Sequence, residues 1–177
     1  MTMVLDGTNG ITTNAGTLLS ATTIGVGGTT PSTSGAGISF PATQSASSDA
    51  NTLDDYEEGT WTPVPISSSG SITSYSSSGT YVKVGRSVTI FGQFILSNVG
   101  TASGGMSING LPFTSLTVTT RTALGLVRED DQTGIFYAIA VTSNSTSAVL
   151  FTLSTNSNPP WTNTWRYGFT FTYITAS

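Results

Sequence analysis

The sequence predicts an all-β protein in which an extended N-terminal arm precedes an antiparallel β-sandwich of the jelly-roll kind. Three observations lead to this prediction. Hydroxyl and glycine residues dominate the chain, and only 8% of its 177 residues are charged, a composition that suits turns and strands better than helices. Segments in the second half alternate apolar and polar residues with a period of two, which is typical of half-buried strands. Residues 1–48 hold too few large apolar side chains to enclose a core.

The alternation is clearest in Ser87–Leu96 and Arg166–Ile174. The residues expected to share the core face of these two strands are Val88, Ile90, Phe94, Leu96, Tyr167, Phe169, Phe171 and Tyr173. Further strands are expected at Thr80–Val84, Met106–Asn109, Ser115–Val127, Ile135–Val141 and Ser147–Leu153. Glycine- and asparagine-rich turns separate them, which is the spacing of a sandwich.

Composition narrows the functional classes. The chain has no histidine and no cysteine, which excludes Ser-His-Asp and Cys-His catalysis, the usual zinc sites and disulfides. Five basic residues face nine acidic ones and form no run, so no nucleic-acid partner is expected. No apolar stretch approaches the length of a membrane span, and the first residues lack the pattern of a signal peptide. We therefore expect a soluble protein made in a cytoplasm, without membrane insertion.

We divide the chain into an attachment arm at 1–48, an acidic junction at 49–63 and a β knob at 64–177. The arm has two interpretations, a disordered tail or an extended segment packed against sister chains or another protein. The second would bury its scattered aliphatic residues in a homotrimer or against an anchor; these are Val4, Leu5, Ile11, Leu18, Leu19, Ile24 and Val26.

The junction reads DANTLDDYEEGTWTP and concentrates four acids around one tyrosine, Tyr56. Three interpretations are open: a glycosidase carboxylate pair, a calcium site, or a structural turn that leads to Trp61 in the core. Catalysis is disfavoured because the acids that could face the cluster lie in VREDDQTG, which we expect to be a solvated turn. We expect a structural junction and no enzyme, with calcium as the alternative cofactor. The calcium ligands would be Asp54, Asp55, Glu57 and Glu58.

Two further groups have competing explanations. The segment NPPWTNTWRYGF carries aromatic and polar side chains that suit either core packing or contact with a sugar. Its candidate glycan contacts are Trp161, Asn163, Trp165 and Arg166. Lys83 and Arg86 flank Gly85, and the simple explanation is a hairpin turn that bears two solvated charges.

Several segments resemble the virion fibre proteins of tailed bacteriophages. The most specific is SSDANTLDDYEEGTWTP, and GTYVKVGRSVTIFGQF, GGMSINGLPFTS and the terminal FTYITAS are similar as well. The resemblance covers residues 31–177, and residues 1–30 resemble short attachment segments of such fibres.

The resemblance implies a homotrimer on the virion surface, with the arm bound to a capsid, tail or adaptor protein and the β knob facing outward. It carries over no catalytic residue. Tail and head attachment stay open, and the short chain favours a head fibre, a decoration protein or an adaptor-bound appendage. Contact with a bacterial surface glycan would fit host adsorption, and a carbohydrate-binding module is the alternative function.

Overall fold

The computed structural model describes residues 23–49, 51–119, 123–153, 155 and 157–176, and the structural statements below concern these residues. The chain divides into two compact units, Met1–Thr43 and Gln44–Ser177. The acidic junction therefore belongs to the same unit as the strands that follow it. None of the described residues forms a helix, so this part of the chain offers no helix that could span a membrane.

The described part of the first unit contains two short strands, β1 (Thr23–Gly25) and β2 (Gly37–Ser39), which pair in parallel. Ile24 and Ile38 are register partners, and their side chains are 50% and 57% exposed. The chain thus folds back on itself here instead of running fully extended. The predicted arm residues Val4, Leu5, Ile11, Leu18 and Leu19 lie outside the described residues.

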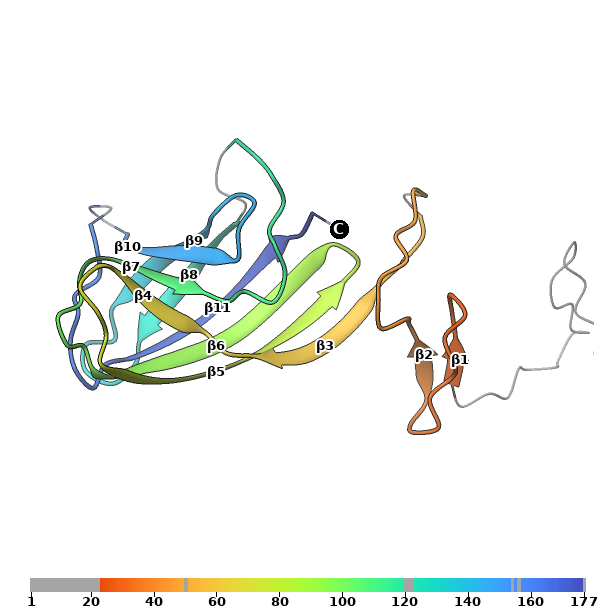
Figure 1. The fold of residues 1–177 in the computed structure, drawn as a ribbon, viewed down its shortest axis with the longest axis horizontal. Helices are drawn as coiled ribbons and strands as arrows, with labels where there is room; N and C mark the ends of the chain where they lie inside the picture. The colour runs from red at the N-terminus through yellow and green to blue at the C-terminus, as the bar shows by residue number, and fades with distance from the viewer. Residues whose placement is uncertain (1–22, 50, 120–122, 154, 156, 177) are drawn as a thin grey trace, which may run out of the picture. The chain divides into compact units, whose positions relative to one another are not determined.

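The second unit is one antiparallel sheet of nine strands in the order β3-β5-β6-β11-β8-β9-β10-β7-β4 (Figure 1). The strands are β3 (Tyr56–Trp61), β4 (Val64–Ser69), β5 (Ser74–Val84), β6 (Ser87–Asn98), β7 (Ser103–Asn109), β8 (Ala123–Glu129), β9 (Phe136–Val141), β10 (Ser147–Thr152) and β11 (Arg166–Ile174). The all-β prediction is confirmed, and hydrogen bonding runs through all nine strands as one sheet.

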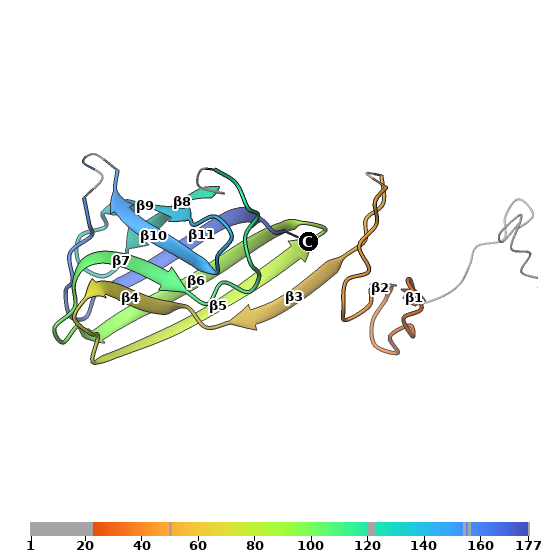
Figure 2. The same ribbon diagram turned by 45° about the horizontal axis from the view of Figure 1, so that its top comes forward.

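The sheet curls strongly, as Figures 1 and 2 show. Its two edge strands, β3 and β4, are neighbours in sequence and are separated only by Thr62 and Pro63. Pro65 is tolerated in β4 because an edge strand has one side without ladder hydrogen bonds. The curl lets side chains from β7 and β10 pack against those of β6 and β11 in a single core.

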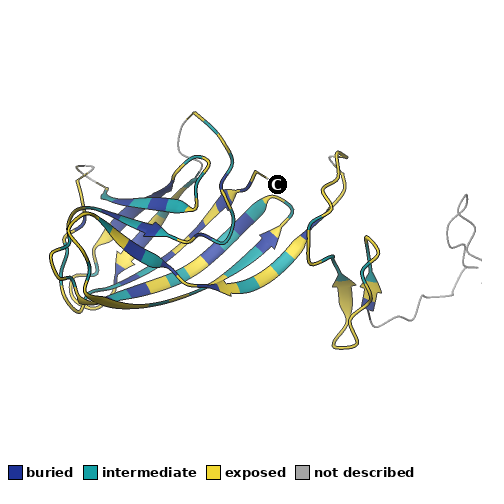
Figure 3. Ribbon diagram, viewed as in Figure 1, coloured by how far each residue is buried: buried dark blue, intermediate teal, exposed yellow. Residues whose placement is uncertain are grey.

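The core follows the predicted alternation, seen as alternating bands of burial in Figure 3. All eight residues assigned to the core face of β6 and β11 are buried. Gly79 and Gly92, which are register partners, leave room on this face for two large rings. A Cβ atom on Gly79 would lie 2.3 Å from Trp61 Nε1, and one on Gly92 would lie 2.6 Å from the Phe169 ring. The two rings meet edge to face at 6.1 Å.

Two differences from the predicted strands have local causes. β3 and β4 were not predicted because acids, prolines and serines mask their alternation. Among the described residues of the predicted strand Ser115–Val127, those from Ala123 onward belong to β8, whereas residues 115–119 form no strand. Residues 115–118 bind the β9–β10 turn instead: the Ser115 hydroxyl donates to the Thr142 carbonyl at 2.5 Å, and the Val118 N–H donates to the Ser143 hydroxyl at 2.8 Å.

Candidate functional site

The acidic junction leads into β3, which is an edge strand of the nine-stranded sheet. Ahead of the strand, the Ser47 N–H donates to Asp54 Oδ2 at 2.8 Å, and Asp49 accepts from the Asn51 N–H at 2.9 Å. The hydrogen bond from the Ser47 N–H lowers the pKa of Asp54, although partial burial opposes it. These contacts hold the described residues close together before the ladder between β3 and β5 begins.

Lys83 is buried beneath the junction, where it forms an ion pair with Asp55. Their side chains are 2% and 6% exposed. Lys83 Nζ also donates to Gln44 Oε1 at 3.2 Å and lies 5.3 Å from the centre of the Phe113 ring. The expectation that Lys83 is a solvated turn residue is therefore wrong. Its position explains why: Lys83 shares strand parity with Tyr81, whose ring points inward.

The predicted hairpin turn at Gly85 is confirmed. Its second charged residue, Arg86, also binds another part of the chain. Arg86 donates from Nε and Nη2 to the Thr175 carbonyl at 3.1 and 3.0 Å. The Gly85 N–H donates to the Asp55 carbonyl at 2.8 Å. The turn therefore connects the junction to the C-terminal end of β11.

The four acids around Tyr56 have four separate partners. Asp54 and Asp55 are engaged as described above, Glu57 accepts from the Tyr81 hydroxyl, and Glu58 accepts from the Tyr56 hydroxyl. Alternation along β3 is the reason, because it directs Glu57 and Glu58 to opposite faces. Among the described residues, no three acidic side chains form a group able to hold a metal ion. The arrangement does not support the calcium interpretation.

Aromatic contacts complete this end of the core. The rings of Tyr81 and Phe113 meet edge to face at 5.4 Å. The Tyr173 hydroxyl donates to the Phe113 carbonyl and accepts from the Phe113 N–H, both at 3.1 Å. Burial raises the pKa of Tyr81 to about 12, with a further contribution from Glu57, and burial raises the pKa of Tyr173 to about 12. Both hydroxyls therefore stay protonated at neutral pH.

We call this set of side chains the junction cluster: Gln44, Asp55, Glu57, Tyr81, Lys83, Phe113 and Tyr173. Within the cluster, the charged and hydroxyl groups form hydrogen bonds or ion pairs with one another or with the backbone. The cluster suits a fixed connection between segments far apart in sequence. Sequence reasoning placed Asp55 and Glu57 here but missed Lys83, although its parity with Tyr81 was a usable signal.

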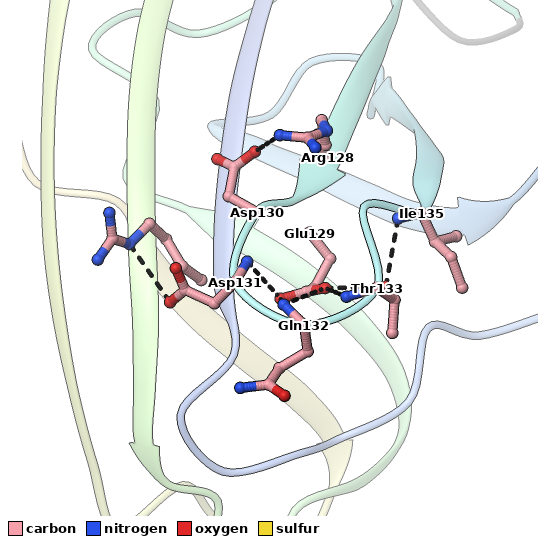
Figure 4. A network of polar contacts seen from close by, with 8 residues as sticks. Arg128, Glu129, Asp130, Asp131, Gln132, Thr133 and Ile135 are labelled. Atoms are coloured by element: carbon pink, nitrogen blue, oxygen red, sulfur yellow. Dashed lines mark hydrogen bonds and ion pairs between the residues drawn. The ribbon is translucent and has the colours of Figure 1, made fainter.

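A second charged group, the Glu129 loop (residues 129–135), connects β8 to β9 (Figure 4). Glu129 is fully buried, and its carboxylate accepts from the backbone N–H groups of Asp131, Gln132 and Thr133 at 2.9, 3.0 and 2.6 Å. The Thr133 hydroxyl donates a further bond at 2.8 Å. The expectation of a solvated turn is wrong for Glu129.

The electrostatics of Glu129 follow from this geometry. Burial raises the pKa of its carboxyl, but the donors from Thr133, Asp131 and Gln132 together outweigh burial and bring the pKa below its usual value. Arg128 and Asp130 form an exposed ion pair at 2.6 Å beside it, and Arg166 Nε lies 3.5 Å from Asp131. The loop is therefore organised around one buried anion and rimmed by solvated charges.

The predicted glycan contacts all make contacts within the chain, although Asn163 is exposed and the Arg166 side chain is 43% exposed. Trp161 Nε1 donates to the Gly104 carbonyl at 3.0 Å, and Asn163 Oδ1 accepts from the Val99 N–H at 2.7 Å. The rings of Trp161 and Trp165 are partly buried against the core. Arg166 lies at the start of β11 beside Asp131. These contacts favour the packing interpretation of this segment.

A shallow hollow lies on the solvent side of β3, β5 and β6 and has a volume of about 640 Å³. The Phe91 ring, 51% exposed, lies in its lining. The lining also contains the buried residues Trp61 and Phe169 and several exposed hydroxyl and amide residues, namely Thr60, Thr62, Ser78, Thr80 and Gln93. Sequence reasoning missed this group because its polar members are single residues on β3, β5 and β6 and in the connection between β3 and β4.

Comparison with known protein families, with curated proteins and with solved structures finds no match to this chain.

Proposed function

We propose that this chain is a non-enzymatic structural protein of a tailed-bacteriophage particle, a short trimeric fibre or decoration protein with a β knob that faces outward. One observation carries the proposal. The separate segments that resemble fibre proteins meet in space at the junction cluster, where their polar side chains bind one another.

Each of these segments supplies a contact. The DDYEE segment supplies Asp55 and Glu57, and the segment GTYVKVGRS supplies Tyr81, Lys83 and Arg86. The GLPF turn supplies Phe113, and the terminal FTYITAS supplies Tyr173 and the Thr175 carbonyl. A motif spread over the chain that builds one buried connection suits a structural role, since the same side chains would be exposed in a catalytic cleft.

Assembly is supported by exposed apolar surface in both units. Ile24 and Ile38 pair with each other in the first unit and are half exposed. On the outer face of the sheet, Phe91 and Leu126 flank Thr170 in the register and are each 51% exposed. Exposed aliphatic and aromatic groups of this kind are commonly covered in an oligomer. The sister chains of a homotrimer and a capsid, tail or adaptor protein would cover them.

Two measurements test the proposal. Light scattering on the purified chain should give the mass of a trimer; a stable monomer at micromolar concentration would contradict the trimer. Deletion of residues 1–30 should leave the sheet folded by circular dichroism and abolish incorporation into particles. If the shortened chain still loads onto particles, the anchor lies elsewhere in the chain.

The shallow hollow that Phe91 lines favours a second candidate function, that of a carbohydrate-binding module. An exposed ring surrounded by hydroxyl and amide groups fits the face of a neutral sugar, to which the rim would donate hydrogen bonds. A glycan array should then show binding that Phe91→Ala removes and that Trp161→Phe, a control at the packed aromatic segment, retains. Equal binding by wild type and Phe91→Ala would exclude the hollow.

A further inference from the structure

The ion pair between Lys83 and Asp55 is costly as two charges. Both side chains are almost fully buried, and removal of an ammonium and a carboxylate from water carries a large desolvation cost for each ion. Condensation requires a neutral amine and a carboxylic acid in contact, and transfer of one proton from Lys83 to Asp55 across their hydrogen bond would supply both. These two groups are the reactants of an amide bond.

A third group lies where it could move the proton. Glu57 is the register partner of Lys83 in the β3–β5 ladder, and side chains directly opposite each other in such a ladder share one face. The hydrogen bond from the Tyr81 hydroxyl fixes the Glu57 carboxylate on that face. The Phe113 ring, 5.3 Å from Lys83 Nζ, contributes to the burial of the amine. An amine, a carboxyl group and a second carboxylate thus gather at the buried end of the β3–β5 ladder.

We propose that Lys83 and Asp55 become joined by an intramolecular isopeptide bond. Lys83 Nζ attacks Asp55 Cγ, so that a carbon–nitrogen bond forms and one carbon–oxygen bond of the carboxyl group breaks. Glu57 accepts the proton from the attacking nitrogen and returns it to the departing hydroxyl, which leaves as water. One amine and one acid give one amide and one water, and neither an oxidant nor a cofactor is required.

The fold supplies the driving force for this condensation. Amide formation is unfavourable between separate molecules in water, but groups held in contact react with effective molarities of about 10⁵–10⁸ M. Burial also keeps bulk water from the product. The bond would connect the residue before β3 to β5 across 28 positions of sequence, so a force on the incoming chain would pass covalently into the sheet. This inference is independent of the proposed virion role.

The test is the mass of the full-length chain under denaturing conditions. We expect wild type to weigh less than its sequence mass by one water, whereas Lys83→Arg and Asp55→Ala should have their full sequence masses. Trypsin should leave the bond after Lys83 uncut, so that residues 1–86 stay one peptide whose mass is lower by one water, because no other lysine or arginine precedes Arg86. Chymotrypsin, which can cut between Asp55 and Lys83 at Trp61 and Tyr75, should then yield a branched peptide that contains both residues. A wild-type chain at its full sequence mass, or a water loss mapped to another peptide, overturns the proposal without reference to any variant.

The role of Glu57 has its own control. Glu57→Gln keeps the shape and hydrogen-bonding reach of the side chain but removes the proton acceptor. We expect the water loss to become incomplete in freshly folded Glu57→Gln protein, while the matched outer-face variant Glu58→Gln resembles wild type. Complete condensation in both variants at the same rate would exclude Glu57 as the proton acceptor and leave the bond itself in place.

Discussion

The junction cluster and the Glu129 loop both bury charge, but they stabilise it in different ways. Asp55 is balanced by a cation 28 residues away in sequence, so its partner is available only when the sheet has folded. Glu129 is balanced by backbone N–H groups two to four residues further along the chain. The comparison teaches that burial of an acid in this fold does not by itself indicate a reactive site. What matters is whether the partners are local donors or a remote amine.

The largest effect should follow from removing the remote partner. Lys83→Met keeps most of the side-chain volume but leaves Asp55 buried without a cation, and losing one member of a buried pair typically costs about 3–5 kcal/mol. Urea unfolding followed by tryptophan fluorescence would measure the loss. The double variant Lys83→Met/Asp55→Leu removes the unpaired carboxylate and should recover that part of the loss, while the stabilisation from the proposed amide stays absent in both variants. A double variant as unstable as the single one would show that the loss comes from the missing amide or from packing and not from the unpaired charge.

The local partners should matter less. Glu129→Gln keeps the shape but places an NH2 group against backbone donors, and loss of hydrogen bonds to a charged acceptor costs about 1.5–3 kcal/mol. Gln132→Ala is the matched control, because only the backbone N–H of Gln132 contacts the carboxylate. The control should stay within about 0.5 kcal/mol of wild type in the same urea titration. An equal loss in both variants would locate the effect in the loop backbone.

The pH dependence should separate the two regions. The pKa of Glu129 is lowered in the folded state from an ordinary value of 4.5, so its contribution is present above that pH and is lost as pH falls further. The pKa of Tyr81 is raised from 10.0 to about 12, so its contribution is complete below pH 10 and is lost as pH rises toward 12. Thermal unfolding midpoints measured across pH should therefore fall at both ends. Glu129→Gln should flatten the acid side only and Tyr81→Phe the alkaline side only.

The two regions also differ in how far the sequence could predict them. Period-two alternation identified the inward faces of β6 and β11 because each of these strands is long and has one buried face. It could not assign Lys83 by residue type, since a lysine on an inward face is rare and depends on a partner from another segment. The β3–β5 ladder begins at Tyr56 and so puts Asp55, the residue before it, beside Lys83, and this ladder pairs two strands that β4 separates in sequence.

Glu129 was missed for a different reason. Its neighbours Arg128, Asp130 and Asp131 are polar and partly or fully exposed, so the segment has the composition of a solvated turn. The buried member is revealed only by strand parity, since Glu129 is two residues after the core residue Val127. In both regions strand parity indicates the buried position correctly, whereas residue type indicates an exposed one. The burial of Lys83 and Glu129 was therefore missed because their charge was given more weight than the alternation of the strand.

The smallest effect is expected at the exposed ion pair beside the Glu129 loop. Arg128 and Asp130 have side chains 47% and 34% exposed, and pairs in such surroundings contribute about 0–1 kcal/mol because water and salt screen them. Arg128 also lies over the Phe136 ring at 5.9 Å, so Arg128→Lys should separate the two contributions better than a truncation. We expect a change within about 0.5 kcal/mol that shrinks further in high salt. A larger, salt-independent loss would show that the arginine acts through its contact with the ring, and that the rim of this loop resembles the junction cluster more than its exposure indicates.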